Sequence, residues 1–139
     1  MKRCIALGFV VVAAGCASGP SAERLVPATS PAGARVDMYL GHRASGADHI
    51  LVELLEVRDT AVVVLGSDRR VWLFGYGAIF RARCPELPGG LEFGRGVPPP
   101  LALRDRLRLV SRFPGGLNPQ VLEQLLHGYG QTALEVRLE

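Results

Sequence analysis

Short apolar runs separated by tight turns constrain the fold of this chain more than any other feature. Residues 50–52, 62–65 and 71–74 are apolar at every position rather than at alternate ones. A strand with one face in water alternates apolar and polar residues, whereas a strand covered on both faces does not. We therefore expect a small sheet with one face closed on itself and the other beneath a lid.

The segments around these runs predict five antiparallel strands joined by short turns. β-branched residues favour strands, and the Gly-, Asp- and Ser-containing gaps between the segments are typical of hairpin turns. The expected strands cover residues 35–40, 49–57, 61–65, 70–74 and 79–83. The predicted fold class is α+β, with a small antiparallel five-stranded barrel-like sheet, then a two-helix C-terminal part and a final short strand.

The C-terminal part carries two helical patterns that supply the expected lid. A first apolar stripe recurs at helical spacing, at Leu103, Leu107 and Val110. A second helix has clear start signals, because Asn118 suits the N-cap and Pro119 the first helical position. Glycines at 128 and 130 predict its end, and alternation over 134–138 predicts a last strand at a sheet edge.

The strand-rich part resembles small SH3-like or Sm-like barrels over about residues 35–84. The resemblance lies in architecture and hydrophobic rhythm. The Gly and Asn of an Sm-type motif are missing between Leu54 and Val64, so no RNA-binding residue is carried over. The net charge does not predict nucleic-acid binding either, since 14 Arg and 13 acidic residues remain once residues 1–15 are removed.

The N-terminus has the pattern of an export signal. Lys2 and Arg3 precede an apolar run over residues 5–14, and small residues precede Cys16. The run is about ten residues, and a helix needs roughly twenty to cross a bilayer. The segment resembles the signal peptide and lipobox of bacterial lipoproteins, although Ala13 stands where a large aliphatic residue is usual.

The resemblance implies that Cys16 receives a diacylglyceryl group, that the chain is cut after Gly15, and that the new N-terminus gains an acyl chain such as palmitate. The protein would then be lipid-anchored to the cell membrane or the outer membrane and face the periplasm. Ala17 rather than Asp after the Cys favours the outer membrane by the rule of enteric bacteria. The alternative is ordinary secretion with cleavage near Ala17 or Ser18.

The expected organisation follows from these segments and from the Pro-, Ser-, Ala- and Gly-rich stretch after Cys16, which has no periodicity that could bury a face. We expect a signal peptide over 1–15, a lipidated Cys and flexible tether over 16–34, a small β-barrel-like domain over 35–87, a Gly/Pro connector over 88–100, and a helical hairpin with a terminal strand packing on the sheet over 101–139.

Candidate reactive groups are few. His42, Asp48 and His49 form an imidazole–carboxylate cluster that would hold zinc or copper, but the spacing fits no known motif and the favoured interpretation is solvated loop residues. Glu53 and Glu56 are three apart on one strand and are expected on opposite faces, which does not suit an acid/base pair. No catalytic, cofactor-binding or metal-ligating residue is assigned.

Three further features have two interpretations each. The aromatic residues Trp72, Phe74, Tyr76 and Phe80 are either core or a peptide-binding strip. Cys84 is either a small apolar residue at a strand end or a reactive thiol. The arginines at 104, 106, 108 and 112 form either a solvated helix face or a contact with anionic lipid or an envelope protein.

These observations favour a lipid-anchored, non-enzymatic envelope protein with a structural or interaction role. It would contact the membrane through the lipid anchor and an envelope protein through its folded part, and it would need no cofactor. The alternative is a lipoprotein that binds a peptide, peptidoglycan or metal. A hydrolase would need a site without a recognisable motif.

Overall fold

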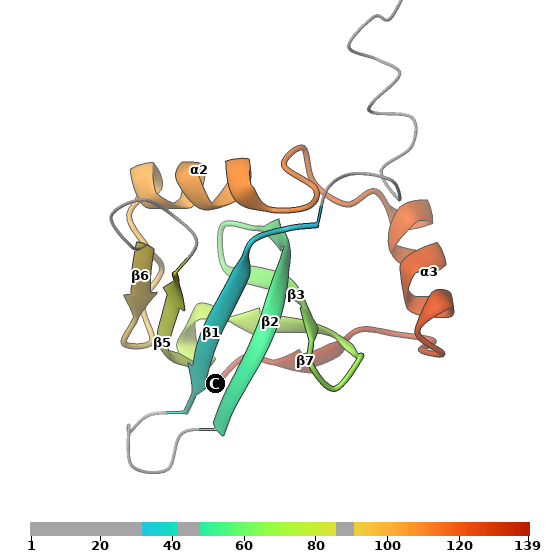
Figure 1. Ribbon diagram of the computed structural model, residues 1–139, viewed down its shortest axis with the longest axis horizontal. Coiled ribbons are helices and arrows are strands. Elements are labelled where there is room, and N and C mark those ends of the chain that lie inside the picture. Colours follow the sequence, from blue (N-terminus) through green and yellow to red (C-terminus); the bar gives the residue numbers. More distant parts are fainter. Residues whose placement is uncertain (1–31, 42–47, 86–90) are drawn as a thin grey trace, which may run out of the picture.

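A computed structural model describes residues 32–41, 48–85 and 91–139 as an α+β fold (Figure 1). The strands are β1 (Arg35–Leu40), β2 (Asp48–Val57), β3 (Ala61–Gly66), β4 (Val71–Gly75), β5 (Ile79–Cys84), β6 (Leu91–Gly94) and β7 (Glu135–Arg137). The helices are α2 (Leu101–Val110) and α3 (Pro119–Gly128), and a short 3₁₀ turn, η3 (Tyr76–Ala78), separates β4 from β5. The signal peptide and most of the tether lie outside the described residues.

The strands form one sheet in the order β6-β5-β1-β2-β3-β4-β7. All neighbours are antiparallel except β4 and β7, which are parallel. The five predicted strands are confirmed as β1 to β5 and are contiguous in the sheet. The sheet has seven strands, because the predicted final strand joins it as β7 and because β6 forms inside the stretch predicted as a connector over 88–100. With only four residues amid Gly and Pro, β6 has too short a pattern to stand out.

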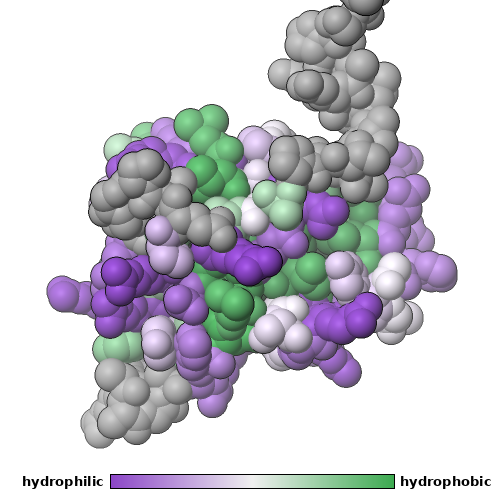
Figure 2. Space-filling model, viewed as in Figure 1, coloured by the Kyte–Doolittle hydropathy of each residue, from purple (hydrophilic) through white to green (hydrophobic). Residues whose placement is uncertain are grey.

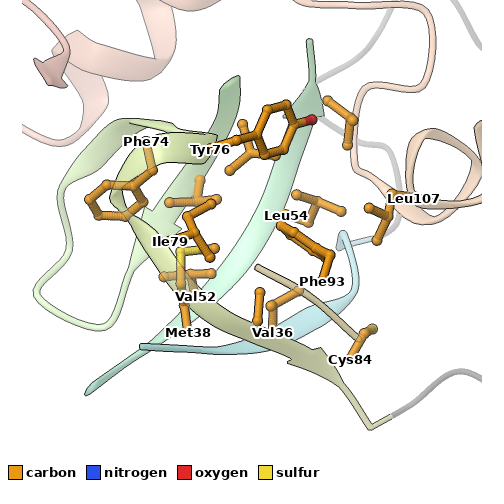
Figure 3. Close-up of a cluster of buried hydrophobic side chains, with 14 of the residues drawn as sticks. Val36, Met38, Val52, Leu54, Phe74, Tyr76, Ile79, Cys84, Phe93 and Leu107 are labelled. Atoms are coloured by element: carbon orange, nitrogen blue, oxygen red, sulfur yellow. The ribbon is translucent and has the colours of Figure 1, made fainter. Parts of the chain in front are cut away.

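One side of the sheet encloses the main hydrophobic cluster, which we call the inner cluster (Figure 3). It takes side chains from β1 to β6 and from α2, and its buried members are Val36, Met38, Leu40, Val52, Leu54, Val57, Val62, Val64, Phe74, Tyr76, Ile79, Ala82, Cys84, Phe93 and Leu107. The rings of Tyr76 and Phe93 meet edge to face at 6.1 Å. The turn after β4 and the edge strand β6 therefore face each other across the cluster.

A second, outer cluster lies on the other side of β2, β3 and β4. Its buried members are Leu55, Val63, Val71, Phe113 and Leu126. Helix α3 covers this side, so the strands with unbroken apolar runs are covered on both faces, as their sequences predict. Helix α2 instead places Leu107 in the inner cluster. The two helices thus pack on different clusters, whereas the sequence predicts a helical hairpin over 101–139.

The ends of the C-terminal elements form as their sequences predict. The Asn118 side chain accepts a hydrogen bond from the Val121 amide at 2.8 Å, which caps α3. After α3, Gly130 adopts a left-handed conformation with φ of 70°. Strand β7 then pairs with β4, and the Gln131 side chain extends this pairing, because it bonds both the amide and the carbonyl of Val71.

A β-bulge in β2 joins three distant parts of the chain. Leu54 pairs with Val64 and Glu56 with Val63, so Leu55 is an extra residue. The freed carbonyls of Leu54 and Leu55 accept hydrogen bonds from the amides of residues 112 and 113, at 3.0 and 2.9 Å. We call residues 33–34, 54–56 and 110–113 the bulge junction.

The first described residues are held at this junction. The Ala34 amide donates to the carbonyl of Val110, and the Ala34 carbonyl accepts from the amide of Leu54, each at 2.9 Å. Gly33 donates its amide to a Glu53 carboxylate oxygen at 2.8 Å. The folded part therefore begins between β2 and the C-terminal end of α2.

Candidate interaction surface

Among the described residues, none on the outward side of β1, β5, β6 or the first half of β2 belongs to the outer cluster. Helix α3 covers the other half of the sheet. We call this region the open sheet face; its exposed or half-exposed side chains include Asp37, Tyr39, His49, Leu51, Arg81, Arg83 and Glu92. Figure 2, viewed with β1 and β2 in front, shows hydrophilic and hydrophobic side chains next to one another there.

The backbone register places an aromatic and charged row across the open sheet face. Tyr39 lies opposite His49 on β2 and opposite Arg81 on β5. The rings of Tyr39 and His49 stack with centroids 4.6 Å apart. The His49 Nε2 lies 3.2 Å from an Asp37 carboxylate oxygen, and the Arg81 Nε lies 2.8 Å from Glu92. The row thus offers a flat stacked pair beside a guanidinium.

A cavity of about 660 Å³ lies at the end of this row, lined by Phe80, Arg81, Glu92, Phe93, Gly94 and Arg95. The pairing of β1 and β5 skips Phe80, and this bulge lets Phe80 and Arg81 both line the cavity. Arg95 has a left-handed φ of 64°, and its amide donates to the Phe80 carbonyl at 2.8 Å. Arg81 is already paired with Glu92 in this lining, so the aromatic carbon and the Arg95 guanidinium are the groups that suit an apolar ligand with a carboxylate.

The two described residues of the predicted imidazole–carboxylate cluster, Asp48 and His49, do not come together. Asp48 lies 3.1 Å from Arg137, whereas His49 contacts Asp37 and stacks on Tyr39. Their side chains diverge, as expected for neighbours on a strand. His42 lies outside the described residues. Across the ranges that the structure describes, no group of three or more His, Cys, Asp or Glu is arranged to hold a metal ion.

Glu53 and Glu56 face the same side of the sheet, so the prediction that they lie on opposite faces is wrong. Glu53 pairs with Leu65 and Glu56 with Val63, and both of these partners belong to the outer cluster. The extra residue Leu55 causes this, because a bulge shifts the alternation of side chains by one position.

Both carboxylates hold the backbone around the bulge junction. Glu53 accepts from the Gly33 amide and lies 3.8 Å from an Arg112 nitrogen. Glu56, which is almost fully buried, accepts from the Leu117 amide at 3.2 Å. The two side chains therefore fasten the segment that leads from α2 to α3.

The four predicted aromatic residues do not form one strip. Phe74 and Tyr76 belong to the inner cluster, so the core interpretation is right for both. Trp72 is half-buried, stacks on Phe74 at 5.4 Å and donates its indole N–H to Asp68. Of the four, Phe80 lines the cavity at the open sheet face. Cys84 is buried in the inner cluster, as expected for a small apolar side chain.

Tyr76 gives the fold a dependence on alkaline pH. Burial raises the pKa of Tyr76 to about 12, and its hydroxyl donates to the Arg58 carbonyl at 2.9 Å. The pKa of Tyr76 in the folded state exceeds its value of about 10 in the unfolded state. The contribution of Tyr76 to the free energy of unfolding is therefore complete below pH 10 and is lost as pH rises toward 12. We expect chemical denaturation to show a steeper loss of stability over this range in the wild type than in Tyr76→Phe.

The predicted solvated face of arginines is wrong for Arg104 and Arg108. Helix α2 lies across the β2–β3 turn, where Asp59 accepts from both guanidinium groups, at 3.2 and 2.8 Å. Arg112 lies near Glu53 at the bulge junction. Arg106 is exposed on the outward side of α2. Sequence alone does not reveal these pairs, because each joins residues that are far apart along the chain.

Comparison of the chain with protein-family models, with curated proteins and with solved structures found no match. None of the helices within the described residues has the length and apolar character needed to span a membrane.

Proposed function

We propose that this chain is an exported, lipid-anchored envelope protein and that its folded part is a non-enzymatic interaction module. The lipid anchor on Cys16 would hold it at the cell membrane or outer membrane, facing the periplasm. The open sheet face would bind an envelope protein. We also infer that β1 to β5 form a barrel-like unit similar to SH3-like barrels, which the contiguous order β5-β1-β2-β3-β4 supports.

The composition of the open sheet face is the main support for an interaction role. Protein interfaces are enriched in aromatic residues and arginine around an apolar centre. Here the Tyr39–His49 stack lies beside Arg81, and Leu51 is 42% exposed on the same side of the sheet. Helix α3 covers the equivalent side of β3 and β4, whereas no described helix covers the open sheet face, which leaves that half suited to a partner.

Chemical crosslinking of the native lipoprotein in intact cells tests this role. The wild type is expected to yield a reproducible envelope partner, and Arg81→Glu is expected to lower its recovery at least tenfold. The matched control is Glu123→Arg, a charge reversal at an exposed position of α3. Equal recovery from both variants, or no reproducible partner for the wild type, would contradict the proposal.

The cavity favours a second candidate, a ligand-binding lipoprotein. Its aromatic lining and Arg95 suit a peptide or peptidoglycan stem peptide with a free carboxylate, beside the Arg81–Glu92 pair. A thermal-shift series with muropeptides is expected to raise the unfolding midpoint of the wild type and to leave Arg95→Ala unchanged. An unchanged wild-type midpoint with every fragment would reject this candidate.

A further inference from the structure

Helix α2 has apolar side chains on two sides. Its inward side packs Leu103, Leu107 and Val110 against the inner cluster. On its outward side Leu109 is 77% exposed and Leu101 is 61% exposed. Figure 2 shows hydrophobic side chains standing out where α2 lies along the top of the molecule. An amphipathic helix that buries one face in a core does not need leucines on the other.

The chain enters the folded part at the C-terminal end of α2, next to Leu109. The Ala34 amide donates to the carbonyl of Val110, the residue that follows Leu109. The segment that starts at Cys16 therefore ends at the C-terminal end of α2. The exposed apolar residues of the C-terminus, Val136 and Leu138, lie at the β7 edge, away from α2 in Figure 1.

The segment between Cys16 and the folded part is short enough to keep α2 near the proposed lipid anchor on Cys16. Residues 17–31 have the composition of a flexible linker, for which fifteen residues give an average end-to-end distance of roughly 20 Å. Their fully extended reach is about 50 Å. A surface within this distance has a high effective concentration, so even a weak contact between α2 and lipid would be populated.

We propose that, in the lipid-anchored protein, the outward side of α2 lies on the bilayer surface. Leu101 and Leu109 enter the interfacial region, and the exposed Arg106 lies among anionic headgroups. Asp105 lies between the two leucines on the same side, where its carboxylate is paired with Arg108 at 2.9 Å. This orientation rests on the proposed anchor at Cys16. It leaves the open sheet face, which lies on another side of the molecule, accessible to a partner (Figure 1).

Brominated-lipid quenching of tryptophan fluorescence tests the orientation. The mature chain, residues 16–139 with Cys84→Ala, is coupled through Cys16 to a maleimide lipid in vesicles of phosphatidylethanolamine and phosphatidylglycerol. Chemical coupling makes the result independent of whether cells lipidate Cys16. Leu109→Trp is expected to be quenched at least twofold more than the control Glu123→Trp on α3. The native Trp72 gives the same background in both.

Equal quenching of the two variants would overturn the orientation. So would a tryptophan of Leu109→Trp that is buried without vesicles, because a second copy of the protein would then cover α2. Matching unfolding midpoints establish that both variants are folded, and Leu101→Trp is expected to repeat the Leu109 result. A failed orientation with an acylated Cys16 in cells would leave the proposed anchor standing. An unmodified Cys16 in cells would reject the anchor whatever the quenching shows.

Discussion

Gly33→Ala is expected to lower the free energy of unfolding by about 3 kcal/mol, the upper range for overpacking a tight site. A Cβ at Gly33 would overlap the Leu54 carbonyl oxygen and would lie 2.9 Å from the Arg112 amide nitrogen. Both neighbours are backbone atoms, so no side chain can move aside to make room.

The backbone at this position is fixed by the hydrogen bonds of the bulge junction. The amide of Arg112 donates to the same Leu54 carbonyl that the new methyl group would meet. Relief would require separating β2 from the segment after α2, which breaks the pairing on both sides of the bulge. In a domain of about 100 residues, a loss of this size lowers the unfolding midpoint by roughly 12 °C or more.

Thermal and urea unfolding of the purified mature chain measure this effect. The matched control is Gly128→Ala, because a Cβ there meets nothing within 4 Å and Ala favours the helix. We expect the control to equal or slightly exceed the wild type in stability. A Gly33→Ala variant as stable as the control would show that residues 33–34 are not held at the bulge junction.

Phe113→Ala is expected to cost about 3 to 5 kcal/mol, the range for removing a large buried aromatic side chain. Phe113 is 6% exposed and is one of five buried members of the outer cluster. Its amide is also bonded to the Leu55 carbonyl, so the ring is held over the bulge by its own backbone. The cavity left by Ala cannot close without moving α3 or β2.

Two comparisons separate this effect from a general sensitivity to mutation. Phe113→Leu keeps most of the apolar volume and is expected to cost less than half as much. Leu109→Ala removes a leucine that is 77% exposed and is expected to change the free energy of unfolding by less than about 1 kcal/mol. Urea unfolding of the three variants gives the order. A loss below about 1 kcal/mol for Phe113→Ala would contradict a buried outer cluster.

The pattern of apolar residues predicted the main features of the sheet. Unbroken runs in β3 and β4 indicated strands covered on both faces, and α3 covers them. Alternation in β1 predicted one inward side, and Val36, Met38 and Leu40 are buried there. The cap and glycine signals around α3 located that helix correctly, because helix ends depend on local sequence.

Features set by contacts between distant residues could not be predicted. At the bulge around Leu55, the carbonyls of Leu54 and Leu55 bind the amides of residues 112 and 113, and the bulge reverses the expected facing of Glu56. The sequence predicts solvent-facing arginines on α2, because their partner Asp59 is far away in sequence. For the candidate surface, the sequence singles out His49, but the contacts of His49 with Asp37 and Tyr39 depend on the register of β1 against β2.

Mass spectrometry of the mature N-terminus, on protein isolated from membranes of the native cell, tests the proposed anchor most directly. We expect the chain to begin at Cys16, with a diacylglyceryl thioether on its sulfur and an acyl chain on its amino group. A chain that begins at Ala17 or Ser18 without lipid, or that retains residues 1–15, would contradict the proposal.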